Sequence, residues 1–288
     1  MWDQIAARIS EVTGEKFQVD RHNSVGGGCI NQGYKISDHS RTYFVKINQA
    51  VDVAMFEAEA LGLQQIQETQ TIRVPQPICW GTAGDSAYIV LEWIELGARG
   101  KNQAWQTMGQ KLAALHRYKG KSEFGWDINN TIGATPQINT WTADWIQFWV
   151  EHRIGYQLKL GRRRGGNFPQ GERLLTVIPE LLAGHQPQPS LVHGDLWGGN
   201  ASVTPAGEPV IFDPASYWGD REVDLAMTEL FGGFPEAFYR GYNQAWPLQA
   251  GYQRRKILYN LYHILNHFNL FGGSYESQAN QMIKMMLS

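Results

Sequence analysis

The sequence of 288 residues is poor in cysteine and contains no long apolar run. Its two cysteines, Cys29 and Cys79, are too few for a disulfide framework, so we expect a chain that works in the reducing cytoplasm. No run of about 18 apolar residues occurs, although a helix needs about that length to cross a membrane. The start, Met1 to Gln4, lacks the basic residues of a secretory signal. We therefore expect no membrane partner.

The sequence also has no large excess of positive or negative residues. The 25 Lys and Arg residues nearly balance the 27 Asp and Glu residues, which gives a net charge of −2 at pH 7. This balance does not provide the positive surface that nucleic acids require, so we expect no nucleic-acid partner. The basic run at residues 162–164 lies between two glycines and is typical of a solvated loop.

The first third of the chain has the pattern of a small β-sheet. Its strand-like runs are rich in β-branched and aromatic residues and are separated by turn-rich pieces. We predict strands over 17–25, 32–37, 41–48, 78–81 and 87–92, and helices over 2–13 and 54–67. This order of elements is typical of a mostly antiparallel sheet with a helix packed on it.

Beyond residue 97 the pattern becomes mostly helical. The predicted helices cover residues 105–115, 141–160, 171–182, 223–231 and 254–270, and a short β-segment ends at Asp213. The sequence thus predicts an α+β fold with two lobes, because 288 residues exceed most single cores. We assign residues 1–91 to an N-lobe, 92–97 to a hinge and 98–288 to a C-lobe. Ligand clefts favour such junctions.

The strongest chemical signal is a pair of segments in the second half of the chain. Residues 193–200 read HGDLWGGN, and residues 210–214 read VIFDP. In phosphoryl transfer, an Asp such as Asp195 accepts the proton of the attacking hydroxyl, while Asn200 and Asp213 hold Mg²⁺. Oxygen ligands suit this hard cation. Taken singly, these residues could equally close a turn, cap a helix or end a strand, but their combined spacing predicts a kinase.

A lysine near the end of a predicted strand supports the same chemistry. Lys46 follows the apolar run 43–45, where it could reach the α- and β-phosphates of ATP. A helical glutamate should pair with it, and residues 54–67 offer Glu57 and Glu59. Spacing barely separates these two candidates. Taken alone, Lys46 could also be a surface lysine whose stem packs along the sheet.

A glycine-rich loop lies between the first two predicted strands. Its backbone N–H groups could approach nucleotide phosphates, because the loop contains Gly26, Gly27, Gly28 and Cys29. The loop only partly matches a nucleotide-binding pattern and is neither a Walker A loop nor a Rossmann turn, so a plain hairpin turn is equally consistent. The pair His263 and His267 lacks the glutamate of a zinc motif, so we interpret both as core or surface histidines.

These segments together resemble the fructosamine kinases, also called ketosamine-3-kinases. This family is a branch of the protein-kinase-like fold near the aminoglycoside phosphotransferases. The resemblance covers essentially the whole chain, and its most specific parts are residues 217–227 (YWGDREVDLAM) and 130–137 (NTIGATPQ). It also includes residues 26–31, 44–46, 55–59, 193–200 and 212–215.

The resemblance implies an enzyme that uses ATP and Mg²⁺. Its reaction is phosphorylation of the sugar 3-hydroxyl of free or protein-bound ketosamines, which destabilises the adduct and repairs glycation. It implies that Asp195 is the proton acceptor and that Lys46 pairs with Glu59 rather than Glu57. It further implies that residues 92–94 (Glu92, Trp93 and Ile94) form the adenine-binding hinge.

Further expectations concern the substrate and the loop cysteine. Trp197, Asp220 and Glu222 are candidates for contact with the substrate, since aromatic faces suit sugars and amine cations. In the fructosamine kinases a loop cysteine can join two chains, which implies a redox-sensitive homodimer through Cys29. A small residue tolerated in a turn is an equally good interpretation of Cys29. The alternatives to a ketosamine kinase are a kinase of an aminoglycoside-like or choline-like amine, and a non-catalytic, redox-responsive nucleotide-binding protein.

Overall fold

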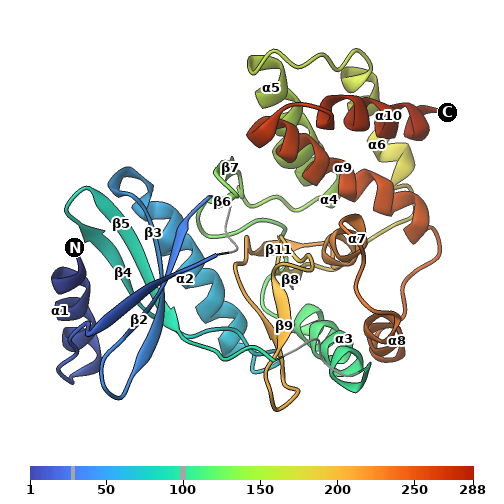
Figure 1. The fold of residues 1–288 in the computed structure, drawn as a ribbon. Coiled ribbons are helices and arrows are strands. Elements are labelled where there is room, and N and C mark those ends of the chain that lie inside the picture. The colour runs from blue at the N-terminus through green and yellow to red at the C-terminus, as the bar shows by residue number, and fades with distance from the viewer. Residues whose placement is uncertain (27–29, 98–101) are drawn as a thin grey trace.

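The computed structural model describes residues 1–26, 30–97 and 102–288. An antiparallel sheet with two helices forms the N-terminal part, and a larger, mostly helical part follows it (Figure 1). The predicted α+β architecture is therefore confirmed. The structure describes no helix that is both long enough and apolar enough to cross a membrane.

The N-terminal sheet has five strands in the order β1-β2-β3-β5-β4, and all neighbours are antiparallel. The strands are β1 (Arg21–Val25), β2 (Gln32–Ser37), β3 (Thr42–Gln49), β4 (Pro77–Ala83) and β5 (Ser86–Glu92). In this register Lys46 on the central strand β3 lies between Gly33 of β2 and Ile89 of β5. A central strand is held on both sides, which fixes the position of the lysine.

The two faces of this sheet pack against different helices. On one face, α1 (Trp2–Thr13) buries Ile5 and Ile9 together with Val45 of β3. On the other face, α2 (Val53–Glu68) belongs to the main hydrophobic core of the molecule, against which Phe44 also packs. Side chains along β3 thus alternate between the two faces of the sheet, which directs Lys46 toward α2 and the larger part of the molecule.

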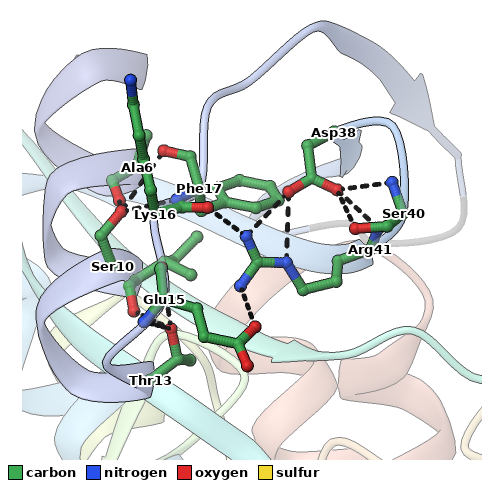
Figure 2. A network of polar contacts seen from close by, with 10 residues as sticks. Ala6, Ser10, Thr13, Glu15, Lys16, Phe17, Asp38, Ser40 and Arg41 are labelled. Atoms are coloured by element: carbon green, nitrogen blue, oxygen red, sulfur yellow. Dashed lines mark hydrogen bonds and ion pairs between the residues drawn. The ribbon is translucent and has the colours of Figure 1, made fainter.

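A polar network fastens the segment that follows α1 to the turn between β2 and β3 (Figure 2). Arg41, just before β3, donates to the carbonyl of Lys16, to Glu15 at 3.2 Å and to Asp38 at 2.9 Å. Asp38 also accepts the backbone N–H of Arg41 at 2.6 Å, which closes the β2–β3 turn. These contacts stabilise the N-terminal helix and lie on the face of the sheet opposite Lys46.

The C-terminal part is built from helices and short β-hairpins. Its helices are α3 (Asn102–Arg117), α4 (Trp145–Phe148), α5 (Tyr156–Arg163), α6 (Gly171–Leu181), α7 (Glu222–Leu230), α8 (Glu236–Ala245), α9 (Tyr252–Phe271) and α10 (Tyr275–Leu287). Its paired strands are β6 (Asn130–Ile132) with β7 (Thr135–Gln137), β8 (Ser190–Val192) with β11 (Tyr217–Gly219), and β9 (Ala201–Val203) with β10 (Pro209–Ile211).

The helix predicted over 141–160 is wrong in its boundaries and its continuity. It begins only at Trp145, and its middle, Trp149–Gly155, is a π-helix. This wider turn accompanies Arg153, whose guanidinium is completely buried over the rings of Phe148 and Tyr217. Arg153 also donates to the carbonyl of Ile138 at 2.6 Å, which helps to hold the segment that follows β7.

The two parts of the chain meet at the predicted hinge. Strand β5 ends at Glu92, and Gly97 donates its N–H to the carbonyl of Val203 in β9 at 2.8 Å. Between these points the chain has no regular structure. The lobe boundaries at residues 91–98 stay a prediction, consistent with this change of structure.

Candidate active site

Two cavities lie next to each other where the parts of the molecule meet. The first, of about 570 Å³, is enclosed by β1, β2, β3 and the hinge on one side and by Asn200, Phe212 and Asp213 on the other. Gly26, Lys46 and the hinge residues 92–94 all line it. The structure thus brings the described part of the predicted nucleotide site to one cavity.

The second cavity, of about 440 Å³, contains Asp195 and Trp197. Both cavities are lined by Asn200, Asp213 and residues 30 and 31. The two spaces therefore meet at the residues predicted to hold Mg²⁺. A donor molecule in one cavity and an acceptor in the other would face each other across this junction.

The turn before Asp195 is held by a fully buried carboxylate. Asp224 on α7 accepts the backbone N–H of His193 at 2.7 Å and that of Gly194 at 2.8 Å. Gly194 has φ +83°, and a Cβ there would come within 2.2 Å of the carbonyl oxygen of Ala215. This position therefore requires glycine, and the turn presents Asp195 to the second cavity.

His193 connects this turn to the strand that carries Asp213. Its Nε2 contacts the carbonyl of Phe212 at 3.0 Å, and its Nδ1 accepts the backbone N–H of Asp195 at 3.2 Å. Nε2 must therefore carry the proton. Burial lowers the pKa of His193, in keeping with a neutral ring. A neutral histidine thus fixes the distance between the turn that carries Asp195 and the strand end that carries Asp213.

Asn200 and Asp213 present the oxygen atoms that Mg²⁺ prefers. The Asn200 side-chain Nδ2 donates to the Asp195 carbonyl at 2.9 Å and to Asp195 Oδ2 at 3.3 Å, which leaves Oδ1 available to a cation. Asp213 has φ +63° and contacts Lys46 through Oδ1, which leaves its second oxygen available. The residues present therefore fit a magnesium site.

Lys46 forms a buried pair with Glu59 at 2.7 Å, whereas Glu57 is exposed on the same helix. Burial alone would lower the pKa of Lys46, but Asp213 and Glu59 together raise it above its ordinary value. The ammonium therefore stays protonated. It lies where it could bind the phosphates of a nucleotide.

The pKa of Asp195 is raised to about 8, first by burial and then by the neighbouring charges of Asp213 and Asp224. A carboxylate with such a pKa is a better proton acceptor near neutral pH than an exposed aspartate. A cation at Asn200 and Asp213 would offset part of this repulsion. The geometry is thus suited to removing a proton from a hydroxyl in the second cavity.

A family model described as fructosamine kinase matches residues 1–288, the whole chain. The chain belongs to the fructosamine kinase family. It is therefore a kinase, as predicted. A probable ketoamine kinase of Synechocystis is 59% identical over 286 residues, covering 99% of this chain and 97% of that protein. The chloroplastic protein-ribulosamine 3-kinase of Arabidopsis thaliana is 46% identical, covering 94% of this chain and 83% of that protein.

Solved structures agree with this family membership. A candidate fructosamine-3-kinase of Haemophilus somnus superimposes with a TM-score of 0.94 at 32% identity, covering 100% of this chain and 98% of that chain. A thermostable mutant of the aminoglycoside phosphotransferase APH(4)-Ia gives a TM-score of 0.64 at 14% identity, covering 97% of this chain and 98% of that chain. The second likeness shows the kinase-like fold alone.

In this member of the family, Asp220 and Glu222 are not among the residues that line the two cavities. Each is only 1% exposed. Asp220 bonds to His185 and Tyr259, both at 2.6 Å, and Glu222 forms two bonds with Arg255 at 2.7 and 2.8 Å. The structure does not bring them to the place expected for substrate contact. Their carboxylates tie the start of α7 to α9 instead.

Residues 27–29, including Gly27, Gly28 and Cys29, lie outside the described part of the chain. The predicted phosphate loop is therefore represented by Gly26 alone, and pairing of two chains through Cys29 stays a prediction. The other cysteine, Cys79, is buried, and burial raises its pKa to about 12. This thiol is unsuited to redox chemistry.

Two histidines that were predicted to lie in the core or on the surface line the second cavity. His263 and His267 lie one turn apart on α9. Burial lowers the pKa of His263 to about 3 and also lowers that of His267, so both rings are neutral. The spacing of four residues on one helix face was the available signal. The sequence did not indicate that this helix face borders a cavity.

Proposed function

We propose that this chain is an ATP-dependent kinase that phosphorylates the 3-hydroxyl of ketosamines. The observation that carries the proposal is the meeting of two cavities at Asp195, Asn200 and Asp213 in a member of the fructosamine kinase family. The name of the Arabidopsis relative, protein-ribulosamine 3-kinase, supports the position of the hydroxyl and the type of substrate.

In the proposed complex, ATP occupies the first cavity, with its adenine against the backbone of hinge residues 92–94. The side chain of Glu92 is turned toward Arg73, at 2.7 Å, so backbone groups are left to recognise the base. Lys46 binds the phosphates while Glu59 holds its ammonium in place. Asn200 and Asp213 hold Mg²⁺, which neutralises charge on the phosphates.

The ketosamine occupies the second cavity with its 3-hydroxyl beside Asp195. Asp195 accepts the proton of this hydroxyl, and the hydroxyl oxygen forms a bond to the terminal phosphorus of ATP while the bond from that phosphorus to ADP breaks and ADP leaves. The Asn200 amide bonds to the same carboxylate and orients it. Phosphorylation destabilises the adduct, so the proposed physiological role is removal of glycation from amines or proteins in the cytoplasm.

A product assay across several acceptors tests the proposal. Fructosamines, ribulosamines, erythrulosamines, an aminoglycoside and choline are incubated with ATP and Mg²⁺, and phosphorylated products are identified by mass spectrometry. Ketosamines should give the highest kcat/KM, since a site built to bind a polar group rejects analogues without it. Faster phosphorylation of the aminoglycoside or of choline would replace the substrate while leaving the kinase chemistry in place.

Two variants test the roles of the carboxylates. Asp195→Ala should retain nucleotide binding while the rate of phosphoryl transfer falls by about 10²–10⁴-fold. Asp213→Ala should lose Mg²⁺-dependent nucleotide binding as well as turnover. Unchanged turnover in the first variant, or unchanged nucleotide affinity with Mg²⁺ in the second, would contradict the assigned role.

A further inference from the structure

The side of the second cavity that is formed by the ends of α7 and α9 and the start of α10 is built from aromatic rings. Phe231 follows α7, His267 and Phe271 lie on the last turns of α9, and Tyr275 begins α10. The ring of His267 lies 4.9 Å from that of Phe231, 5.1 Å from Tyr275 and 5.7 Å from Phe271, measured between centroids. We call these four residues the aromatic corner.

The aromatic corner carries no charge at neutral pH. His267 uses its Nδ1–H to bond to the carbonyl of His263 at 2.7 Å, and burial lowers its pKa. Among the described lining residues, the carboxylates are Glu59, Asp195 and Asp213. All three lie at the nucleotide end, where they contact Lys46 or Asn200. The cavity is thus polar at one end and apolar at the other.

The aromatic corner is also a side on which the cavity opens to solvent. Phe231 is 37% exposed and Phe271 is 51% exposed, whereas His263 and Asn266, one turn deeper on α9, are buried. When the bound ketosamine is attached to a protein or peptide, the polypeptide must extend out of the cavity through an open side. Exposed aromatic side chains at such an opening are available to a bound molecule.

We propose that the aromatic corner binds the group attached to the amine nitrogen of the ketosamine and favours apolar or aromatic groups there. This inference rests on the proposed function, which places the 3-hydroxyl at Asp195. The amine is bonded to C1, two carbons from C3, so the sugar and the amine fill the polar end. The substituent on nitrogen then extends toward the opening, where apolar surface is removed from water without burying a charge.

The test compares two ketosamines that differ only in this group: the fructose adducts of benzylamine and of methylamine. Both have the same sugar and a secondary amine, so their ratio of kcat/KM isolates the substituent. The benzyl adduct should have about tenfold higher kcat/KM, the gain expected for seating one phenyl ring among aromatic side chains. The adduct of 2-aminoethanol, whose substituent ends in a hydroxyl, should behave like the methyl adduct.

Variants connect this preference to the aromatic corner. Phe271→Ala and Phe231→Ala should each lower the benzyl-to-methyl ratio by about threefold or more. Tyr118→Ala is the matched control, because Tyr118 is 41% exposed and is not among the residues lining either cavity. It should leave the ratio unchanged. Circular dichroism shows whether each variant retains the fold.

The outcomes distinguish a failure of this inference from a failure of the proposed function. Turnover of both adducts with a ratio near one, or an unchanged ratio in both phenylalanine variants, overturns the inference and leaves the proposed function standing. Turnover of neither adduct, with an aminoglycoside or choline phosphorylated instead, overturns the proposed function and the inference with it. A ratio well above one that falls in the phenylalanine variants and not in Tyr118→Ala supports both.

Discussion

Lys46 Nζ lies 2.7 Å from Glu59 Oε1, and both side chains are about nine-tenths buried. Removing the carboxylate charge should leave Asp213 as the only acidic partner of Lys46 among the described residues. In Glu59→Gln, Lys46 should therefore compete more strongly with Mg²⁺ for Asp213. We predict that the Mg²⁺ concentration for half-maximal activity rises and that stability falls by about 1–3 kcal/mol.

The same helix offers a matched control for this prediction. Glu57 has the same chemistry two residues earlier but is exposed. Glu57→Gln should change neither the Mg²⁺ requirement nor the midpoint of urea unfolding. Equal effects in the two variants would show that the Lys46–Glu59 pair has no special role.

This pair shows what sequence alone could and could not resolve. Lys46 and helix α2 were predicted from local patterns, because alternation and helical periodicity depend on neighbouring residues. The choice between Glu57 and Glu59 depends on the rotation of α2 against β3, which is set by packing between distant segments. Only the family resemblance favoured Glu59, and the structure places it beside Lys46.

A second prediction follows from the raised pKa of Asp195. Its folded-state value of about 8 lies above the ordinary value of 3.8, so the folded chain retains a proton that the unfolded chain has released. The contribution of Asp195 to the free energy of unfolding therefore falls as pH rises between about 4 and about 8. Asp195→Asn removes this penalty. Without Mg²⁺ and nucleotide, its Tm should exceed that of the wild type by more at pH 8 than at pH 5.5.

Scanning calorimetry at the two pH values checks this prediction. A Tm difference that is the same at both values would mean that Asp195 is not a destabilised carboxylate in the free protein. Adding Mg²⁺ at pH 8 provides a control, because a cation near Asp195 should stabilise the wild type more than Asp195→Asn. This comparison is independent of turnover, which the variant is expected to lose.

A third prediction concerns Asp224, which accepts the N–H groups of both His193 and Gly194. In Asp224→Asn an NH₂ group replaces one of the two carboxylate oxygens. Because NH₂ cannot accept a hydrogen bond, one of the two N–H groups loses its acceptor. The turn before Asp195 should loosen, so kcat should fall. Stability should drop by about 1–3 kcal/mol, because a buried donor loses its partner.

The control for Asp224 is Asp220→Asn, four residues earlier. Asp220 is equally buried but bonds to His185 and Tyr259, away from the turn. Its substitution should lower stability in urea unfolding and leave kcat of the folded fraction near that of the wild type. A large loss of kcat in Asp220→Asn would instead restore this residue as a candidate for substrate contact.

The remaining differences between sequence and structure share one cause. The π-helix at Trp149–Gly155, the burial of Glu222 against Arg255 and the cavity-facing position of His263 all depend on contacts between distant segments. The segments at residues 193–200 and 210–214 were easier to interpret. Their chemistry is encoded by residue type and short spacing, and the fold needs only to bring two adjacent segments together.

The last prediction concerns Arg73, which joins three parts of the molecule. It lies in the segment between α2 and β4 and donates to Glu92 of the hinge and to Glu208 between β9 and β10, both at 2.7 Å. Its carbonyl accepts the N–H of Ile211 at 3.0 Å, two residues before Asp213. Arg73 thus connects the proposed adenine-binding hinge with the strand that leads to the proposed metal ligand.

A double-mutant cycle with Arg73→Met and Glu208→Gln measures this connection. The side chains of Arg73 and Glu208 are 34% and 43% exposed. Water screens such a pair, which limits the coupling free energy between them to about 0.2–1 kcal/mol. Each single variant should raise the KM for ATP by about two- to fivefold, and the double variant should be no worse than Arg73→Met. Because water and ions screen exposed charges, the differences should shrink at about 1 M salt. Additive effects, or effects that salt does not reduce, would show that Arg73 acts only through its backbone contact with Ile211.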